Sequence, residues 1–310
     1  MGSGAVQGEL RLGRCVFGPD ERVVMAIVNR TPDSFYDKGA TFTDAAAFAA
    51  VERAVGQGAR IIDIGGVKAG PGDEVDATEE IRRTVPFVAA VRARYPDLII
   101  SIDTWRAEVG RAACEAGADL LNDSWGGYDP QLAEVAAEFQ VGLVCTHTGG
   151  TVPRRRPRMG VEYEDVMADI LGQTLALAQR AVELGVPRES VLIDPAHDFG
   201  KATRHSLEAT RRLGEMVATG WPVLVSLSNK DFVGESLDLP PRERLTGTLA
   251  ATAICAWLGA RVYRAHEVVE TRQVLDMVSS IQGTRPPAVS RRGIVPEFSA
   301  PPEPDNASIF

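Results

Sequence analysis

The sequence alternates short apolar segments with longer amphipathic ones along most of its 310 residues, and this alternation constrains the fold more than any other feature. The apolar segments are rich in β-branched residues, and the segments between them have the hydrophobic periodicity of helices. The eight expected strands lie at 23–29, 60–66, 98–104, 119–123, 142–147, 191–197, 222–228 and 261–268. The eight expected helices lie at 44–57, 78–94, 107–116, 130–139, 163–184, 206–219, 241–258 and 271–281. This repetition indicates a parallel sheet covered by crossover helices.

Every expected strand ends in a side chain that can bind a ligand, which separates a barrel from a doubly wound sheet. These side chains are Asn29, Asp63, Asp103, Asn122 with Asp123, His147, Asp194, Ser228, and Arg264 with His266. Barrel enzymes take their active-site residues from many strand ends at one face. A doubly wound nucleotide-binding sheet normally carries a glycine-rich fingerprint, and neither GxGxxG after a strand nor GxxxxGK[ST] occurs. We therefore expect an α/β fold of the (β/α)8 TIM barrel type.

The barrel is expected to form one domain over 21–283. Residues 1–20 are expected to be an extension or a hairpin that plugs the bottom of the barrel. The proline-rich tail at 284–310 is expected to be disordered, because such a composition cannot bury enough apolar surface. The basic run at 153–158 is interpreted as a solvated loop without a catalytic role.

Charge and cysteine content exclude several classes of partner. The formal net charge of -9 argues against a nucleic-acid or anionic-membrane partner. The four cysteines form no CxxC pair, so zinc ribbons and dithiol redox chemistry have no support. The apolar stretch at 245–260 is too short for a membrane span, and residues 1–14 lack the apolar core of a signal peptide. We expect a cytoplasmic protein.

Asp103, Asn122 and Asp194 end the third, fourth and sixth expected strands, so they should meet in one barrel mouth beside Lys230. Carboxylate and amide oxygens along one edge of a pocket suit a heterocycle rich in N–H donors, such as an aminopyrimidinone. The alternative is that each residue caps the following helix.

Arg264 and His266 are two residues apart on the last expected strand, so their side chains point the same way. Such a pair at a barrel rim suits a phosphate or diphosphate, and Asn29 could give an oxygen ligand to a magnesium ion on that group. The alternatives are an ion pair of Arg264 with Glu267 or Glu270 and a hydrogen bond of His266 in the core.

The expected strand ends and the loops after them contain eight characteristic strings: Asn29-Arg30-Thr31-Pro32-Asp33-Ser34-Phe35, Asp63-Ile64-Gly65-Gly66, Ser101-Ile102-Asp103-Thr104, Asn122-Asp123, Asp194-Pro195, Phe199-Gly200-Lys201, Leu227-Ser228-Asn229-Lys230 and Arg264-Ala265-His266-Glu267-Val268. Taken together, these strings resemble dihydropteroate synthase over roughly 23–283. The resemblance implies a transferase that condenses p-aminobenzoate with a dihydropterin hydroxymethyl diphosphate with the help of Mg²⁺. It implies a pterin site at Asp103, Asn122, Asp194, Phe199 and Lys230, a diphosphate site at Arg264 and His266, and a magnesium ligand at Asn29. It also implies a homodimer formed through helices of the second half.

Two loops depart from the family pattern on the side that would receive p-aminobenzoate. Residues 65–72 read Gly-Gly-Val-Lys-Ala-Gly-Pro-Gly in place of Gly-Gly-Glu-Ser-Thr-Arg-Pro-Gly, so the altered positions include Lys68, Ala69 and Gly70. Lys68 cannot reproduce the planar fork of an arginine. Residues 228–231 read Ser-Asn-Lys-Asp in place of Ser-Arg-Lys-Ser, which changes Asn229 and Asp231. A carboxylate at Asp231 would repel an acceptor carboxylate by roughly 1–4 kcal/mol unless it pairs, for instance with Lys68.

These departures favour a paralogue that binds a dihydropterin diphosphate but has impaired or absent condensation with p-aminobenzoate, and no catalytic residue is assigned. Such a chain would use a cationic or neutral amine instead, or only bind ligand. The alternatives are a fully active synthase and a methyltetrahydrofolate-dependent methyltransferase with a corrinoid partner. A more distant alternative is a metal hydrolase with ligands at His147, Asp194, His197 and His266.

Overall fold

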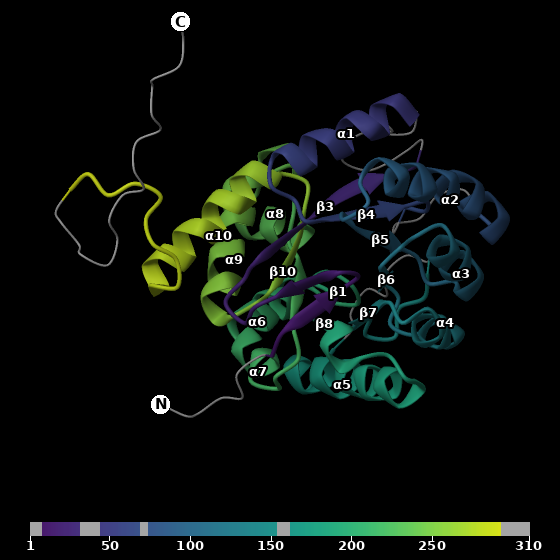
Figure 1. Cartoon of the computed structure of the whole chain (residues 1–310). Coiled ribbons are helices and arrows are strands. Elements are labelled where there is room, and N and C mark those ends of the chain that lie inside the picture. Colours follow the sequence, from purple (N-terminus) through teal and green to yellow (C-terminus); the bar gives the residue numbers. More distant parts are fainter. Residues whose placement is uncertain (1–7, 32–43, 69–73, 154–161, 293–310) are drawn as a thin grey trace, which may run out of the picture.

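The computed structural model describes residues 8–31, 44–68, 74–153 and 162–292. Eight parallel strands form one sheet in the order β8-β7-β6-β5-β4-β3-β10-β9, and a bridge between Ile193 and Val223 joins its two edges. The strands are β3 (Val23–Asn29), β4 (Ile61–Gly65), β5 (Ile99–Asp103), β6 (Leu120–Asp123), β7 (Gly142–Thr146), β8 (Val191–Asp194), β9 (Leu224–Ser226) and β10 (Val262–Ala265). The result is a nearly closed barrel surrounded by helices (Figure 1). The prediction of a (β/α)8 TIM barrel is confirmed.

The helices largely follow the expected segments, with three differences in the second half. They are α1 (Asp44–Gly56), α2 (Ala77–Arg94), α3 (Ala107–Glu115), α4 (Gln131–Phe139), α5 (Val166–Leu184), α6 (Thr203–Arg211), α7 (Leu213–Val217), α8 (Asp231–Leu237), α9 (Leu245–Leu258) and α10 (Val268–Gln282). The helix expected at 206–219 is two helices that meet at Arg212. The short helix α8 was not expected, and the segment expected to start a helix at 241 begins with the 3-10 turn Pro241–Glu243.

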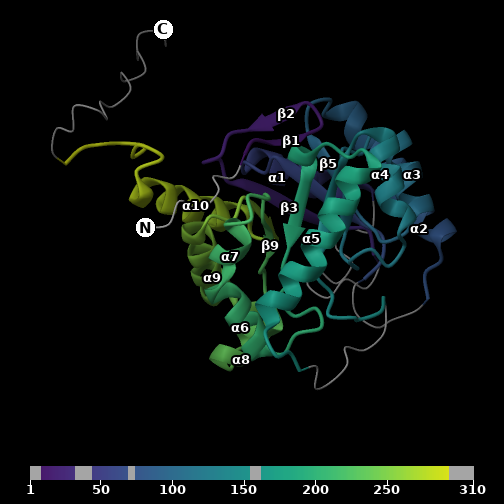
Figure 2. The same cartoon turned by 90° about the horizontal axis from the view of Figure 1, so that it is seen from below.

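The N-terminal segment forms a two-stranded antiparallel hairpin, β1 (Leu10–Leu12) and β2 (Cys15–Phe17), labelled in Figure 2. Leu10, Leu12 and Phe17 are buried against the inward-facing side chains at the start of the barrel strands. Burying a large apolar side chain stabilises a fold by about 1.5–3 kcal/mol, so the hairpin closes the bottom of the barrel and helps to hold it together.

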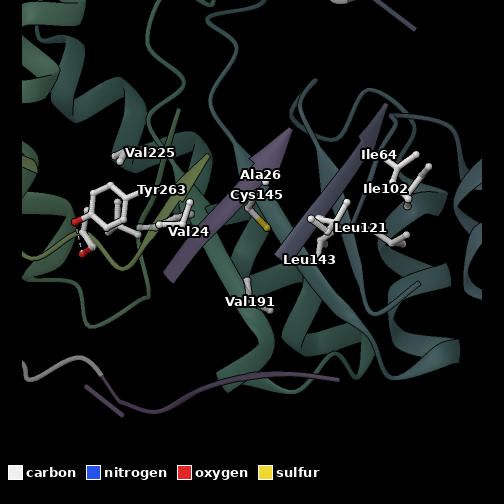
Figure 3. Packing of buried hydrophobic residues seen from close by; sticks show 14 of the residues in the cluster. Val24, Ala26, Ile64, Ile102, Leu121, Leu143, Cys145, Val191, Val225 and Tyr263 are labelled. Atoms are coloured by element: carbon white, nitrogen blue, oxygen red, sulfur yellow. Dashed lines mark hydrogen bonds between the residues drawn. The ribbon is translucent and has the colours of Figure 1, made fainter. Parts of the chain in front are cut away.

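Side-chain alternation divides each strand between two environments. The outward-facing residues pack against the helices in one large apolar cluster, part of which is shown in Figure 3. The inward-facing residues change along the strands, from the apolar Ile61 and Ile99 near the hairpin to the polar Asp63 and Ser101 two positions later. The interior is therefore apolar at the bottom and polar at the C-terminal mouth.

No helix in the described parts of the chain is long and apolar enough to cross a membrane. Residues 284–292 form neither helix nor strand, and the rest of the tail expected to be disordered lies outside the described residues. The basic run from Arg154 to Arg158 also lies outside them.

Candidate functional site

The floor of the barrel mouth is a fully buried carboxylate, Asp63 of β4. It accepts hydrogen bonds from Ser101 Oγ at 2.6 Å, from Asn122 Nδ2 at 3.2 and 3.3 Å, and from Arg264 Nε at 2.6 Å. A buried charge is tolerated only when it is paired and its remaining lone pairs are satisfied. Three other strands, β5, β6 and β10, supply these donors, so Asp63 ties the strand ends together. The sequence marks Asp63 as a polar strand end but does not predict its place in the site.

Arg264 of β10 joins this floor to a second carboxylate, that of Asp103 on β5. Its Nη2 donates to Asp103 Oδ2 at 2.9 Å, while its Nε holds Asp63. Burial raises the pKa of Asp103, and the charge of Arg264 opposes that effect. The ion pair considered as an alternative for Arg264 therefore exists, but its partners are these two aspartates and not Glu267 or Glu270.

Asp194 and Asn122 face the same space from β8 and β6. One oxygen of Asp194 accepts from the backbone N–H of Ala196 at 2.6 Å, and burial raises its pKa to about 6. The amide nitrogen of Asn122 is directed at Asp63, so its oxygen is the end that can accept from a ligand. Helix capping is not their role, nor that of Asp103, because α3, α4 and α6 begin after Arg106, Pro130 and Ala202.

An aromatic row borders the mouth beside Lys230. The Lys230 ammonium lies 4.7 Å from the centre of the Phe199 ring, and burial lowers the pKa of Lys230 against the opposing charges of Asp198 and Asp194. The Phe199 ring meets Trp125 edge to face at 5.4 Å, and Trp125 meets Trp105 in the same way at 6.2 Å. That the two tryptophans border the site was not predicted from the sequence, although each lies two residues after a polar strand end.

Asn29 and His266 complete the ring of strand ends. Asn29 pairs in register with Gly65, and a side chain added at Gly65 would approach Asn29 Oδ1 to 3.6 Å. The backbone N–H of His266 donates to Ser228 Oγ at 3.3 Å, and burial together with the charge of Arg264 lowers the pKa of His266 to about 3. The imidazole is therefore neutral near pH 7, and it can donate a hydrogen bond to an anion but no charge.

Most of the polar strand ends therefore form one inward-facing set around Arg264, and the comparisons with known proteins identify this arrangement. Residues 25–266 match the family model described as pterin binding enzyme. The chain belongs to this family.

Members of the pterin-binding family resemble the chain over most of its length. It is 62% identical to a protein of Mycobacterium leprae named inactive dihydropteroate synthase 2, over 89% of this chain and 96% of that protein. It is 35% identical to dihydropteroate synthase of Streptococcus pyogenes, over 88% of this chain and all of that protein. The solved dihydropteroate synthase of Yersinia pestis in a sulfonamide complex superimposes with a TM-score of 0.84 at 32% identity, covering 89% of this chain and 100% of that one.

The loops expected to form an altered acceptor side differ from the expectation at Asp231. The side chain of Asp231 is 72% exposed and forms an ion pair with Arg244 at 2.8 Å. Its partner is thus Arg244 and not Lys68, so its charge is neutralised and screened by solvent. The repulsion expected from Asp231 is correspondingly reduced. Asn229 directs its amide nitrogen to Glu267 Oε1 at 3.2 Å, while Ala69 and Gly70 lie outside the described residues.

His147 does not face the mouth, although it ends a strand. Its Nε2 donates to Asp169 Oδ1 at 2.6 Å, and its Nδ1 accepts from Lys201 Nζ at 2.6 Å. Lys201 Nζ also donates to the backbone oxygens of Ala196 and Phe199, and burial lowers the pKa of Lys201 to about 7. This buried chain of hydrogen bonds holds the loop that carries Phe199.

The histidines considered as ligands of a metal hydrolase have other partners. His197 Nε2 lies 3.0 Å from Thr210 Oγ1, and its ring stacks on Phe232 at 5.4 Å. Within the described residues, no group of three or more His, Cys, Asp or Glu side chains could hold a metal ion. The described geometry gives the hydrolase hypothesis no support.

Proposed function

We propose that this protein is a dihydropteroate synthase-like paralogue that binds a dihydropterin diphosphate at the barrel mouth and condenses it with p-aminobenzoate poorly or not at all. The observation that carries the proposal is the contrast between the two sides of the mouth. Asp103, Asn122 and Asp194 converge around Arg264 on the pterin side, whereas the acceptor side carries Lys68 and Asp231 in place of the family residues. The similarity to proteins named inactive dihydropteroate synthase 2 supports the same conclusion over an active synthase or a methyltransferase.

The pterin would be recognised by hydrogen bonds along one edge of its ring. Ionised Asp194 can accept from two adjacent N–H groups, as a carboxylate does with an aminopyrimidinone, and the Asn122 oxygen can accept a third. Lys230 can donate to the ring carbonyl from the rim, and Phe199 supplies an apolar wall beside the ring. Arg264 lies beneath as part of the floor, where two carboxylates already hold its guanidinium.

The diphosphate would lie toward Asn29, Arg264 and His266, and we propose that it arrives with Mg²⁺. Mg²⁺ usually takes only one or two protein oxygens and completes its octahedron with water and phosphate oxygens. A single inward-facing amide at Asn29, beside Gly65, which has no side chain, fits such a substrate-held ion. When bound, Mg²⁺ would neutralise the leaving diphosphate, while His266 donates one hydrogen bond from its neutral ring.

We also propose that the protein is a cytoplasmic homodimer. Ile254 and Trp257 on α9 and Met277 and Ile281 on α10 are 50–60% exposed, and these two helices pack side by side. Exposed apolar patches of this kind mark association surfaces, and a second copy of the chain is the occupant that the family resemblance implies. The four free cysteines suit a reducing compartment.

The dimer is tested by sedimentation of the wild type and of Trp257→Glu. We expect a dimer that the substitution converts to a folded monomer. A wild type that sediments as a monomer at micromolar concentration contradicts this part of the proposal.

The binding part is tested by titrating the full chain with 6-hydroxymethylpterin by calorimetry. We expect saturable binding that Asn122→Ala weakens at least about tenfold, since it loses a buried hydrogen bond worth roughly 1.5 kcal/mol. Glu138→Gln on the exposed surface of α4 is the control, and thermal unfolding of each variant shows that it is folded. A folded wild type that does not bind the pterin would overturn the proposal.

A further inference from the structure

The loop between β8 and α6 contains a carboxylate, Asp198, that the family resemblance does not cover. The matching strings stop at Pro195 and resume at Phe199, and the family resemblance assigns no role to the three residues between them. Two of the three have a left-handed backbone, with φ 49° at Ala196 and φ 71° at Asp198. Side chains rarely adopt this conformation, and it persists where the surroundings determine it.

The contacts of Asp198 explain why its conformation is held. Its carboxylate accepts from the backbone N–H of Asp231 at 2.6 Å and from that of Phe232 at 3.3 and 3.4 Å. It also accepts from Ser206 Oγ at 3.2 Å. Every partner donates, which is the arrangement that an ionised, acceptor-only carboxylate needs. Asp198 therefore bonds the start of α8 to the loop that carries Phe199.

Asp198 also offsets the positive charge of Lys230 on the acceptor side. Lys230 precedes α8, lies over the Phe199 ring, and is attracted by both Asp198 and Asp194. The positive charge of the rim is thus already matched by carboxylates of the chain. Asp231, by contrast, is exposed and paired with Arg244, so it contributes little to the charge that an acceptor would meet.

We propose that Asp198 is a specificity-determining residue that makes the acceptor side favour uncharged aromatic amines over anionic ones. This inference rests on the proposed function, because it places an acceptor beside the bound pterin. An anionic acceptor finds Lys230 and the backbone donors of α8 occupied and meets the Asp198 carboxylate at close range. An uncharged aromatic amine meets no such repulsion and can pack against the aromatic row of Phe199, Trp125 and Trp105.

The experiment compares two acceptors of nearly the same shape, p-aminobenzoate and the uncharged p-aminobenzamide. Dissociation constants are measured by calorimetry on the full chain saturated with 6-hydroxymethylpterin, Mg²⁺ and inorganic diphosphate. We expect the wild type to prefer the amide, and Asp198→Asn to shift the ratio about tenfold toward the benzoate. Asp198→Gly should give the same shift, and it also relieves the left-handed backbone if the asparagine variant folds poorly.

The matched control is Asp238→Asn at the opposite end of α8, where an exposed aspartate has φ 54°. It should leave the ratio within about twofold. An unchanged ratio in both Asp198 variants, with the pterin still bound, overturns the inference and leaves the proposed function standing. A shift in Asp231→Asn as large as that in Asp198→Asn also overturns it. A wild type that binds no pterin removes the proposed function and this inference together.

Discussion

Replacing Arg264 with methionine should destabilise the protein strongly, because the guanidinium is the common partner of two carboxylates in the barrel mouth. Asp63 is fully buried and receives Arg264 Nε at 2.6 Å, and Asp103 receives Nη2 at 2.9 Å. Removing one partner of a buried ion pair costs about 3–5 kcal/mol. For a chain of this size we expect a loss of on the order of 10 °C in Tm.

The loss in Arg264→Met should also depend on pH, and its sign follows from Asp103. Burial already raises the pKa of Asp103 in the folded state, and removing Arg264 removes the charge that opposes this shift. The folded variant then binds more protons than the unfolded chain at acidic pH, so its free energy of unfolding recovers toward that of the wild type as the pH falls.

Urea unfolding, followed by tryptophan fluorescence and circular dichroism at several pH values, measures both effects. Arg111→Met is the matched control, because Arg111 and Glu138 form an exposed pair at 2.6 Å whose removal should cost at most about 0.5 kcal/mol. The free energy of unfolding of Arg264→Met should fall by clearly more than about 1 kcal/mol, and the loss should change with pH. A loss below about 1 kcal/mol, or one that does not change with pH, would refute the role of the Asp63–Arg264–Asp103 ion pairs as the floor of the site.

Three further results are expected. Pterin affinity should fall about tenfold per pH unit below about pH 6, because protonation of Asp194 removes the carboxylate that accepts the pterin N–H groups. Calorimetric titrations that show no loss of affinity down to pH 5 would exclude Asp194 as the acceptor. Phe17→Ala should cost about 3–5 kcal/mol in urea unfolding, against under about 1 kcal/mol for the exposed neighbour Val16→Ala, and equal costs would show that the hairpin does not close the barrel. Burial lowers the pKa of Lys201 from its ordinary value of 10.5 to about 7 in the folded protein. Between these two pH values the unfolded chain therefore binds more protons than the folded protein does. The free energy of unfolding of the wild type relative to Lys201→Met should therefore rise from pH 7 toward pH 10, and a flat difference would contradict it.

The strands and the inward-facing polar residues could be predicted because both follow from local patterns. Apolar β-branched runs mark strands, and the period of two then places Asp63, Asp103 and Arg264 on the inner face. Parallel strands end at one face, so convergence of these side chains needed no knowledge of distances.

The partners of these residues could not be predicted, because they are decided by contacts between distant segments. Arg264 bonds Asp63, some 200 residues earlier, and Asp231, the first residue of α8, pairs with Arg244 beyond the end of that helix. The role of Asp198 could not be predicted from the sequence, because it depends on a left-handed backbone and on hydrogen-bond donors from another loop. Helix α8 itself is short and contains Gly234, so its sequence carries little helical periodicity.

The most direct test of the account is the condensation of 7,8-dihydropterin hydroxymethyl diphosphate with p-aminobenzoate in the presence of Mg²⁺, with diphosphate and product measured together. The dihydropteroate synthase of Streptococcus pyogenes, 35% identical to this chain, is the positive control. We predict that the chain binds the pterin substrate but forms product at least about a hundredfold more slowly than the control, a barrier difference of roughly 3 kcal/mol. Product formation at a rate comparable to that of the control would contradict the account.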